Sequence, residues 1–167
     1  KNGNFIVLKQ VQQEANVIQS LLLVSQTVNG STNYVASAGE TLNYKISLSN
    51  IGSSPFSNVF LIVRLKGDAL DFSTLQAPGA TIRQGDAMVV YDFNDFPQLK
   101  NVDVHQSANV SFSIKVKDNW LPAKAETENA IIESQVDVGD ISQKFSIKVN
   151  AGLAIFQKGF YASSDLQ

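Results

Sequence analysis

The chain has 167 residues, of which 44% are hydrophobic and 17% are charged, and it contains no cysteine. This length predicts one domain whose apolar core needs neither a disulfide nor a metal ion for stability. Thirteen basic and fifteen acidic residues give a formal charge of −2, so the surface has no excess of cations for phosphate groups and nucleic acid is not an expected partner. No apolar run approaches the roughly 20 residues of a membrane-spanning helix.

The first segment, residues 1–19, is interpreted as a terminal strand and linker. It begins without methionine and without the charged and apolar regions of a signal peptide, so we expect the chain to be a piece of a processed or longer polypeptide. The segment then belongs either to the end of a preceding unit or to a strand that is donated to a neighbour. Apolar residues at near-helical spacing in 11–23 fit a short helix or a linker that leads into a strand.

Alternation of apolar and polar residues dominates residues 20–150. In 41–49, 110–117 and 145–150 nearly every second residue is apolar, which is typical of strands with one face on a core and the other in water. Val59, Leu61, Val63 and Leu65 also alternate, but Phe60 and Ile62 between them are apolar too. This predicts a central strand or one covered on both faces. Turns rich in Gly, Asn and Pro separate eight or nine such strands, and Gly139-Asp140 is predicted as a two-residue hairpin loop. The pattern favours an all-β antiparallel sandwich.

The last segment, residues 151–167, is predicted to begin a following repeat or to form a strand between subunits. Residues 153–163 (LAIFQKGFYAS) and 22–31 (LLVSQTVNGS) both place Gln after largely apolar residues, as expected if both segments begin the same kind of repeat. Three aromatic side chains of this segment are predicted to pack across a repeat boundary or against another subunit: Phe156, Phe160 and Tyr161.

A compact motif lies in residues 38–59 (AGETLNYKISLSNIGSSPFSNV). It combines a Gly-acid-Thr-Leu-x-Tyr strand, an Asn-x-Gly turn and an Asn-Val pair, and a further Glu-Asn-Ala follows at 128–130. These residues resemble the conserved repeat of bacterial and archaeal cell-surface proteins known as domain of unknown function eleven. The resemblance covers about residues 20–150 and implies an immunoglobulin-like sandwich with Greek-key connections. The residues that carry it are Gly39, Leu42, Tyr44, Asn50, Gly52 and Asn129.

The motif residues are expected to have structural roles. Gly39 is expected to form the turn before a strand, and the buried ring of Tyr44 carries a hydroxyl that can reach the backbone. Asn50 and Gly52 suit a turn that needs side-chain hydrogen bonds and a positive φ.

Residues with catalytic potential are few. His105 is the only histidine, and no Gly-x-Ser-x-Gly sequence presents a nucleophile. His105 is therefore interpreted as a solvated loop residue, and we expect no enzymatic activity and no resident cofactor.

Carboxylates and asparagines offer two further kinds of candidate site. Asp86, Asp92 and Asp95 are candidate calcium ligands, although their spacing differs from an EF-hand loop and also fits a solvent-facing strand edge. Asn29 and Asn109 begin Asn-x-Ser sequences and are candidate glycan acceptors, provided that the chain is exported by an organism that has the machinery.

These observations predict a non-catalytic structural module of an extracellular surface or fibre protein, which acts as a repeat, a spacer or an assembly unit. Its expected partners are neighbouring repeats or identical subunits, with a cell-wall component or a glycan as a further candidate. Two alternatives stay open at this point. One is a filament subunit that polymerises by donor-strand exchange through 1–11 or 153–167, and the other is a carbohydrate- or calcium-binding adhesin module.

Overall fold

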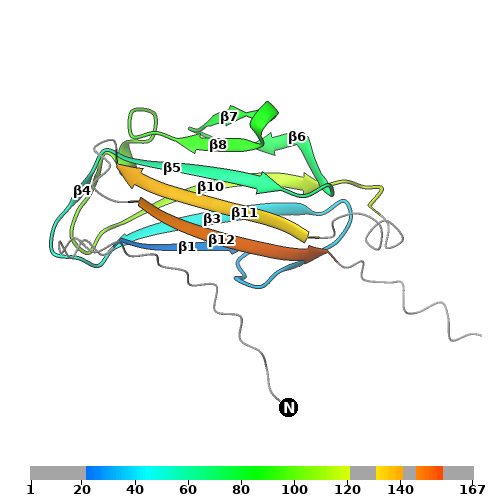
Figure 1. The fold of residues 1–167 in the computed structure, drawn as a ribbon, viewed down its shortest axis with the longest axis horizontal. Helices are drawn as coiled ribbons and strands as arrows, with labels where there is room; N and C mark the ends of the chain where they lie inside the picture. Colours follow the sequence, from blue (N-terminus) through cyan, green and yellow to red (C-terminus); the bar gives the residue numbers. More distant parts are fainter. Residues whose placement is uncertain (1–21, 121–130, 141–145, 156–167) are drawn as a thin grey trace, which may run out of the picture.

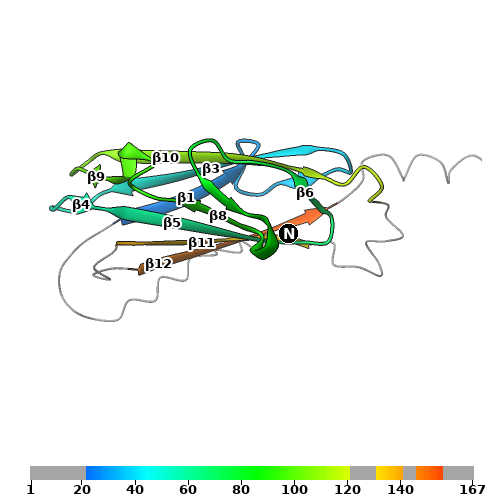
Figure 2. The same ribbon diagram turned by 90° about the horizontal axis from the view of Figure 1, so that it is seen from above.

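The computed structural model describes residues 22–120, 131–140 and, as backbone, 146–155. These residues form two packed β-sheets, which Figure 2 shows as two layers seen from the side. No helix among them has the length and apolarity needed to cross a membrane. The elements, labelled in Figure 1, are β1 (Leu22–Val28), β2 (Val35–Ala36), β3 (Thr41–Asn50), β4 (Phe56–Ser57), β5 (Val59–Lys66), β6 (Leu70–Gln76), β7 (Thr81–Arg83), η1 (Gln84–Asp86), β8 (Met88–Tyr91), η2 (Pro97–Leu99), β9 (Asn101–Val102), β10 (Ser107–Val116), β11 (Ile131–Asp140) and β12 (Ser146–Ile155).

One of the two large sheets has four strands in the order β1-β3-β10-β6, and the other has six in the order β2-β12-β11-β5-β8-β7, while β4 and β9 form a separate two-stranded antiparallel sheet. All neighbouring strands are antiparallel except β2 and β12, which are parallel. Successive strands repeatedly cross from one sheet to the other, as in a Greek key. The orders β1-β3-β10-β6 and β12-β11-β5 are the ABED and GFC arrangement of an immunoglobulin-like sandwich, with β8 and β7 added beside β5. The predicted fold class is therefore confirmed.

Burial follows the alternation in the sequence. In β3 and β10 every second side chain is buried and the intervening ones face outward. β5 lies between β11 and β8 in the six-stranded sheet, as the apolar residues on both of its faces predicted, and its outward Phe60 and Ile62 are half-buried. One apolar cluster fills the space between the sheets and includes Tyr44, Tyr91 and Trp120.

The predicted hairpin loop at Gly139-Asp140 is wrong. Both residues belong to β11, where Gly139 pairs with Phe60 on one side and with Ser146 on the other, and Asp140 pairs with Val59. A Gly-Asp pair can form a tight turn, but here Gly139 pairs with strands on both sides and Asp140 with β5, so the pair extends the strand.

The last described strand also differs from the expectation. β12 runs through Ile155, so the predicted boundary at residue 150 falls within a strand of the sandwich. Leu153 and Ala154 pair with β11, and Ala154 and Ile155 pair with β2, all within the same chain. These three residues therefore complete their own sandwich and are not a strand donated to a neighbour. The proposed donor strand at 1–11 lies outside the described residues, as do Phe156, Phe160 and Tyr161. So does most of the 11–23 window, although its last two residues begin β1.

Candidate functional site

The motif in residues 38–59 lies at the two ends of β3. At its start, Gly39 has a φ of +75°, and a Cβ atom there would lie 2.7 Å from Asp118 Oδ1. Leu42 points into the core with no exposed surface. Glycine meets both demands without strain, and Gly39 lies in a turn directly before β3. Asn129, the outlying member of the motif, is outside the described residues.

Asn50 ends β3 as a buried hydrogen-bonding centre, with 1% of its surface exposed. Its Nδ2 donates to the carbonyls of Ser54 at 2.8 Å and Val102 at 3.0 Å, and its Oδ1 accepts from Gly52 N–H at 3.0 Å. Its main-chain carbonyl accepts from His105 N–H at 3.0 Å. One amide thus joins the loop after β3 to the segment before β10. Its bond to Gly52 N–H agrees with the expected side-chain hydrogen bonding of the turn, but Gly52 does not have the expected positive φ.

Tyr44 departs from its expected hydrogen bonding. Its ring stacks on Phe112, with 4.5 Å between centroids and 8° between planes, and is 1% exposed. Its hydroxyl is buried and has no hydrogen-bond partner in the part of the chain that the structure describes. The hydroxyl of Tyr91 on β8 makes the expected contact instead, donating to the Ser111 carbonyl at 2.6 Å. Burial raises the pKa of both hydroxyls well above the ordinary value, because the phenolate is disfavoured away from water.

The three candidate calcium ligands are not gathered into one site. Asp86 pairs with Arg83 at 3.0 Å, and Asp92 Oδ1 accepts from the backbone and side-chain nitrogens of Asn94, both at 2.7 Å. Asp95 is exposed. Among residues 22–120, 131–140 and 146–155 no group of three Asp, Glu, His or Cys side chains is placed to hold a metal ion.

The histidine and the two Asn-x-Ser positions lie on the surface. His105 is exposed in the turn before β10, with a φ of +63°. Asn29 Nδ2, the atom to which a glycan would be attached, donates to the Thr41 carbonyl at 3.2 Å and to Glu40 Oε1 at 3.3 Å. Asn109 is exposed on β10, and its Oδ1 accepts from Ser47 Oγ at 2.6 Å. Glycosylation stays a prediction at both positions, and Asn109 has the freer Nδ2.

A shallow groove of about 600 Å³ crosses the outer face of the four-stranded sheet. Its floor is formed by β3 and β10, and it extends from the Asn29-Gly30 turn to Pro78 after β6. This surface has no signature in the sequence, because each strand contributes only one to three polar residues, which singly indicate nothing more than a solvated face. The outward side chains that line it are Thr27, Asn43, Lys45, Gln76, Asn109, Ser111 and Ser113.

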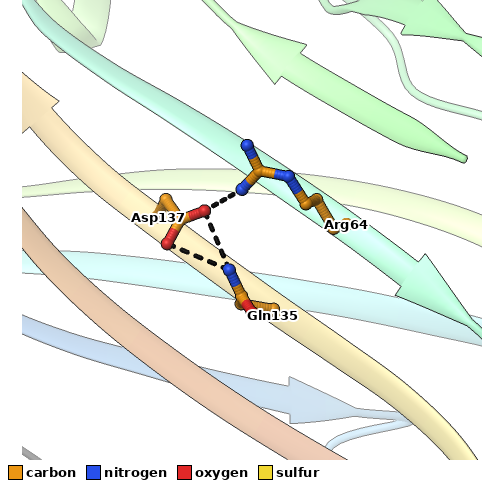
Figure 3. A network of polar contacts seen from close by, with 3 residues as sticks. All are labelled: Arg64, Gln135 and Asp137. Atoms are coloured by element: carbon orange, nitrogen blue, oxygen red, sulfur yellow. Dashed lines mark hydrogen bonds and ion pairs between the residues drawn. The ribbon is translucent and has the colours of Figure 1, made fainter. Parts of the chain in front are cut away.

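The outer face of the six-stranded sheet has a different character. Figure 3 shows Asp137 of β11 between Arg64 of β5 and Gln135 of its own strand. Arg64 Nη1 donates to Asp137 Oδ2, and Gln135 Nε2 donates to the same oxygen at 3.0 Å. Arg64 lies opposite Gln135 in the ladder, so its guanidinium reaches the diagonal neighbour. The pair is partly solvated, with 44% of the Arg64 side chain exposed, and is a stabilising contact between strands more than a reactive centre.

The comparison with protein families identifies the chain. A family model, Domain of unknown function (DUF7619), matches residues 24–138. The chain belongs to the DUF7619 family. The repeat that residues 38–59 resemble, domain of unknown function eleven, does not match, so that identification was too specific. No curated protein matches the chain.

Solved structures resemble this DUF7619 domain in fold at low sequence identity. A cohesin module of a family 33 glycoside hydrolase from Clostridium perfringens matches with a TM-score of 0.51 and 5% identity, over 84% of this chain and 100% of the module. A CARDB domain from Pyrococcus furiosus, in complex with di-metal ions, matches with a TM-score of 0.46 and 8% identity, over 89% and 99%. A FixG-related protein from Vibrio parahaemolyticus matches with a TM-score of 0.40 and 12% identity, over 80% and 95%. The cohesin likeness supports the β-sandwich fold and nothing beyond it.

Proposed function

We propose that this DUF7619 domain is a non-catalytic structural module of an extracellular surface or fibre protein, in which it acts as a spacer between neighbouring units. The observation that carries the proposal is the placement of the outermost described strands. Figure 1 shows β1 starting at one end of the long axis and β12 finishing at the other. Units that the chain enters at one end and leaves at the other can follow one another in a line, and each then lengthens the array by about its own long axis.

The same strands are placed to resist a pull along that line. β1 pairs with β3 through seven residue positions, and β12 pairs with β11 through nine. A force that pulls the start of β1 and the finish of β12 apart acts along both strands. It therefore loads all the hydrogen bonds of a ladder together instead of opening them one by one.

Force spectroscopy of the full chain between reference domains tests the proposal. We expect one cooperative unfolding event, at a force that depends on the β1–β3 ladder. Asn29 N–H donates to the Asn43 carbonyl, and hydrogen-bonded pairs alternate along an antiparallel ladder, which makes Ser25 opposite Ser47 a bonded position. Ser25→Pro removes that donor and is expected to lower the unfolding force.

Ser25→Ala is the matched control, because it changes the same side chain and keeps the backbone N–H. Its unfolding force is expected to equal that of the unaltered chain. Equal forces for Ser25→Pro and Ser25→Ala would contradict a mechanical role for β1, as would stepwise unfolding at forces close to zero.

A further inference from the structure

The groove on the four-stranded sheet is built from rows of residues that face one another across the strands. Thr27, Lys45 and Ser111 form one row on β1, β3 and β10, and Ser113 with Gln76 belongs to the next row. Strands lie about 5 Å apart and rows on one face about 7 Å apart, so these five side chains project into one small area. This area lies within the shallow groove of about 600 Å³.

Hydrogen bonding separates these rows from the rest of the face. The side chains of Thr27, Lys45, Gln76, Ser111 and Ser113 make no hydrogen bond or ion pair within the described part of the chain. Further along the same strands, Ser47 Oγ bonds Asn109 Oδ1 at 2.6 Å and Ser49 Oγ bonds Ser107 Oγ at 2.8 Å. The five side chains of these rows are thus available to a ligand, whereas two other lining residues are already paired, Asn109 with Ser47 and Asn43 with Asn29.

The groove carries a single positive charge. Lys45 is the one charged residue among those that line it, and none of them carries a carboxylate. The remaining outward groups are hydroxyls and carboxamides, which both donate and accept hydrogen bonds. A ligand with many hydroxyl groups and one carboxylate would match this set.

Other classes of ligand fit less well. The floor strands β3 and β10 are each paired on both sides, so a peptide cannot add a strand there. The aromatic and aliphatic residues at the floor, Tyr44, Val110 and Phe112, are at most 3% exposed and offer no pocket for an anchoring side chain. A single cation is too few for a nucleic-acid backbone.

We propose that this groove binds a short oligosaccharide that carries a carboxylated sugar. Lys45 pairs with the carboxylate, and the hydroxyls and amide of Thr27, Gln76, Ser111 and Ser113 hydrogen-bond to the sugar hydroxyls. The proposal is independent of the spacer function, since a spacer unit needs no ligand.

A titration of the full chain followed by amide chemical shifts tests the proposal, with galacturonic acid trimer as the probe and galactose trimer as its neutral counterpart. We expect saturable shifts for the acidic trimer at residues 27, 45, 76, 111 and 113, with millimolar affinity. Lys45→Gln is expected to weaken binding of the acidic trimer about two- to fivefold, as for one exposed ion pair, and to leave binding of the neutral trimer unchanged. Lys45→Arg is expected to restore the affinity.

Lys66→Gln provides the matched control, because Lys66 is an exposed lysine on the opposite sheet. It is expected to bind the acidic trimer as the unaltered chain does. The proposal is overturned if neither trimer causes saturable shifts, if the shifts map to the six-stranded sheet, or if Lys45→Gln binds the acidic trimer unchanged. An acidic peptide of equal charge that binds at least as well would also overturn it, in favour of a protein partner.

Discussion

The two ends of β3 use polar side chains in opposite ways. Where the strand starts, Glu40 is half-buried and accepts hydrogen bonds from the Tyr34 hydroxyl, from Ser37 N–H at 2.8 Å and from Asn29 Nδ2 at 3.3 Å. Where the strand ends, Asn50 is buried and its neutral amide makes three hydrogen bonds. The charged carboxylate of Glu40 therefore remains accessible to water, whereas the neutral amide of Asn50 is shielded from it.

This difference explains why a neutral residue closes one end and a charged residue the other. Burying an ionised carboxylate costs far more free energy than burying an amide whose hydrogen bonds are all made. Removal of a buried amide, however, leaves its former hydrogen-bond partners unsatisfied, because water cannot reach them. When a half-exposed carboxylate is removed, water can take over its hydrogen bonds. The end at Asn50 is therefore expected to be the more sensitive to substitution.

Substitution of Asn50 is expected to have the largest effect. Asn50→Ala should lower the free energy of unfolding by about 3 kcal/mol, because the buried Val102 carbonyl and the partly buried Ser54 carbonyl and Gly52 N–H all lose their partner. Denaturant unfolding measures this loss. Ser54→Ala is the control, since Ser54 contributes only its main-chain carbonyl, and it should change stability by less than about 0.5 kcal/mol. A loss below about 1 kcal/mol for Asn50→Ala would contradict the assigned role.

Substitution of Gly39 tests the other end of β3, where the strand starts. Gly39→Ala should cost about 2 kcal/mol, of which about 1 comes from the positive φ and the rest from the approach to Asp118 Oδ1. Gly30 has a φ of +82°, and no atom lies within 4 Å of the place that a Cβ atom would take there, so Gly30→Ala should cost only the backbone part. Thermal unfolding of both variants checks the difference, and equal losses would show that Asp118 simply moves away.

Glu40 itself is expected to contribute less than Asn50. Glu40→Ala should cost about 1 kcal/mol, because Tyr34, Asn29 and Ser37 N–H can turn to water. Glu133→Ala, at an exposed position of β11, serves as the comparison and should be nearly neutral. If Glu40→Ala destabilised the chain as much as Asn50→Ala, the contrast between the two ends would fail.

The smallest effect is expected midway along β3. Tyr44→Phe should change stability near neutral pH by less than about 0.5 kcal/mol, since its hydroxyl makes no hydrogen bond within the described residues, while Tyr91→Phe should cost about 1 kcal/mol.

The stability of the chain at alkaline pH should also depend on Tyr44. Because burial raises the folded-state pKa of Tyr44, its contribution to the free energy of unfolding is complete below about pH 10, where the unfolded tyrosine ionises, and is lost as the pH rises further. Urea unfolding below and above about pH 10 should show a smaller alkaline loss for Tyr44→Phe than for the unaltered chain.

Much of the fold was predictable because alternation has a direct physical meaning. A polar residue between two apolar ones in a strand points away from the core, and residues 41–50 and 107–116 follow this rule along their whole length. Gly39 and Asn50 were also recognisable as turn residues, since their conformational and hydrogen-bonding demands are local.

Other features depended on contacts between distant segments. Gly139-Asp140 has the composition of a turn, but pairing with Val59 and Phe60, about 80 residues away, holds it in a strand. The hydroxyls of Tyr44 and Tyr91 could not be told apart from sequence, because the acceptor, Ser111, belongs to a third strand. The groove was equally hidden, since its lining comes from several strands.

The antiparallel β-sandwich and its neutral polar surface could be derived from the amino-acid sequence, because period-two burial and local turn chemistry need no knowledge of partners. Three properties required the folded chain: which polar groups have hydrogen-bond partners, where the last strand belongs and which side chains share the groove. These properties depend on strand order and register, which are set by the packing of the two sheets together and not by any one segment.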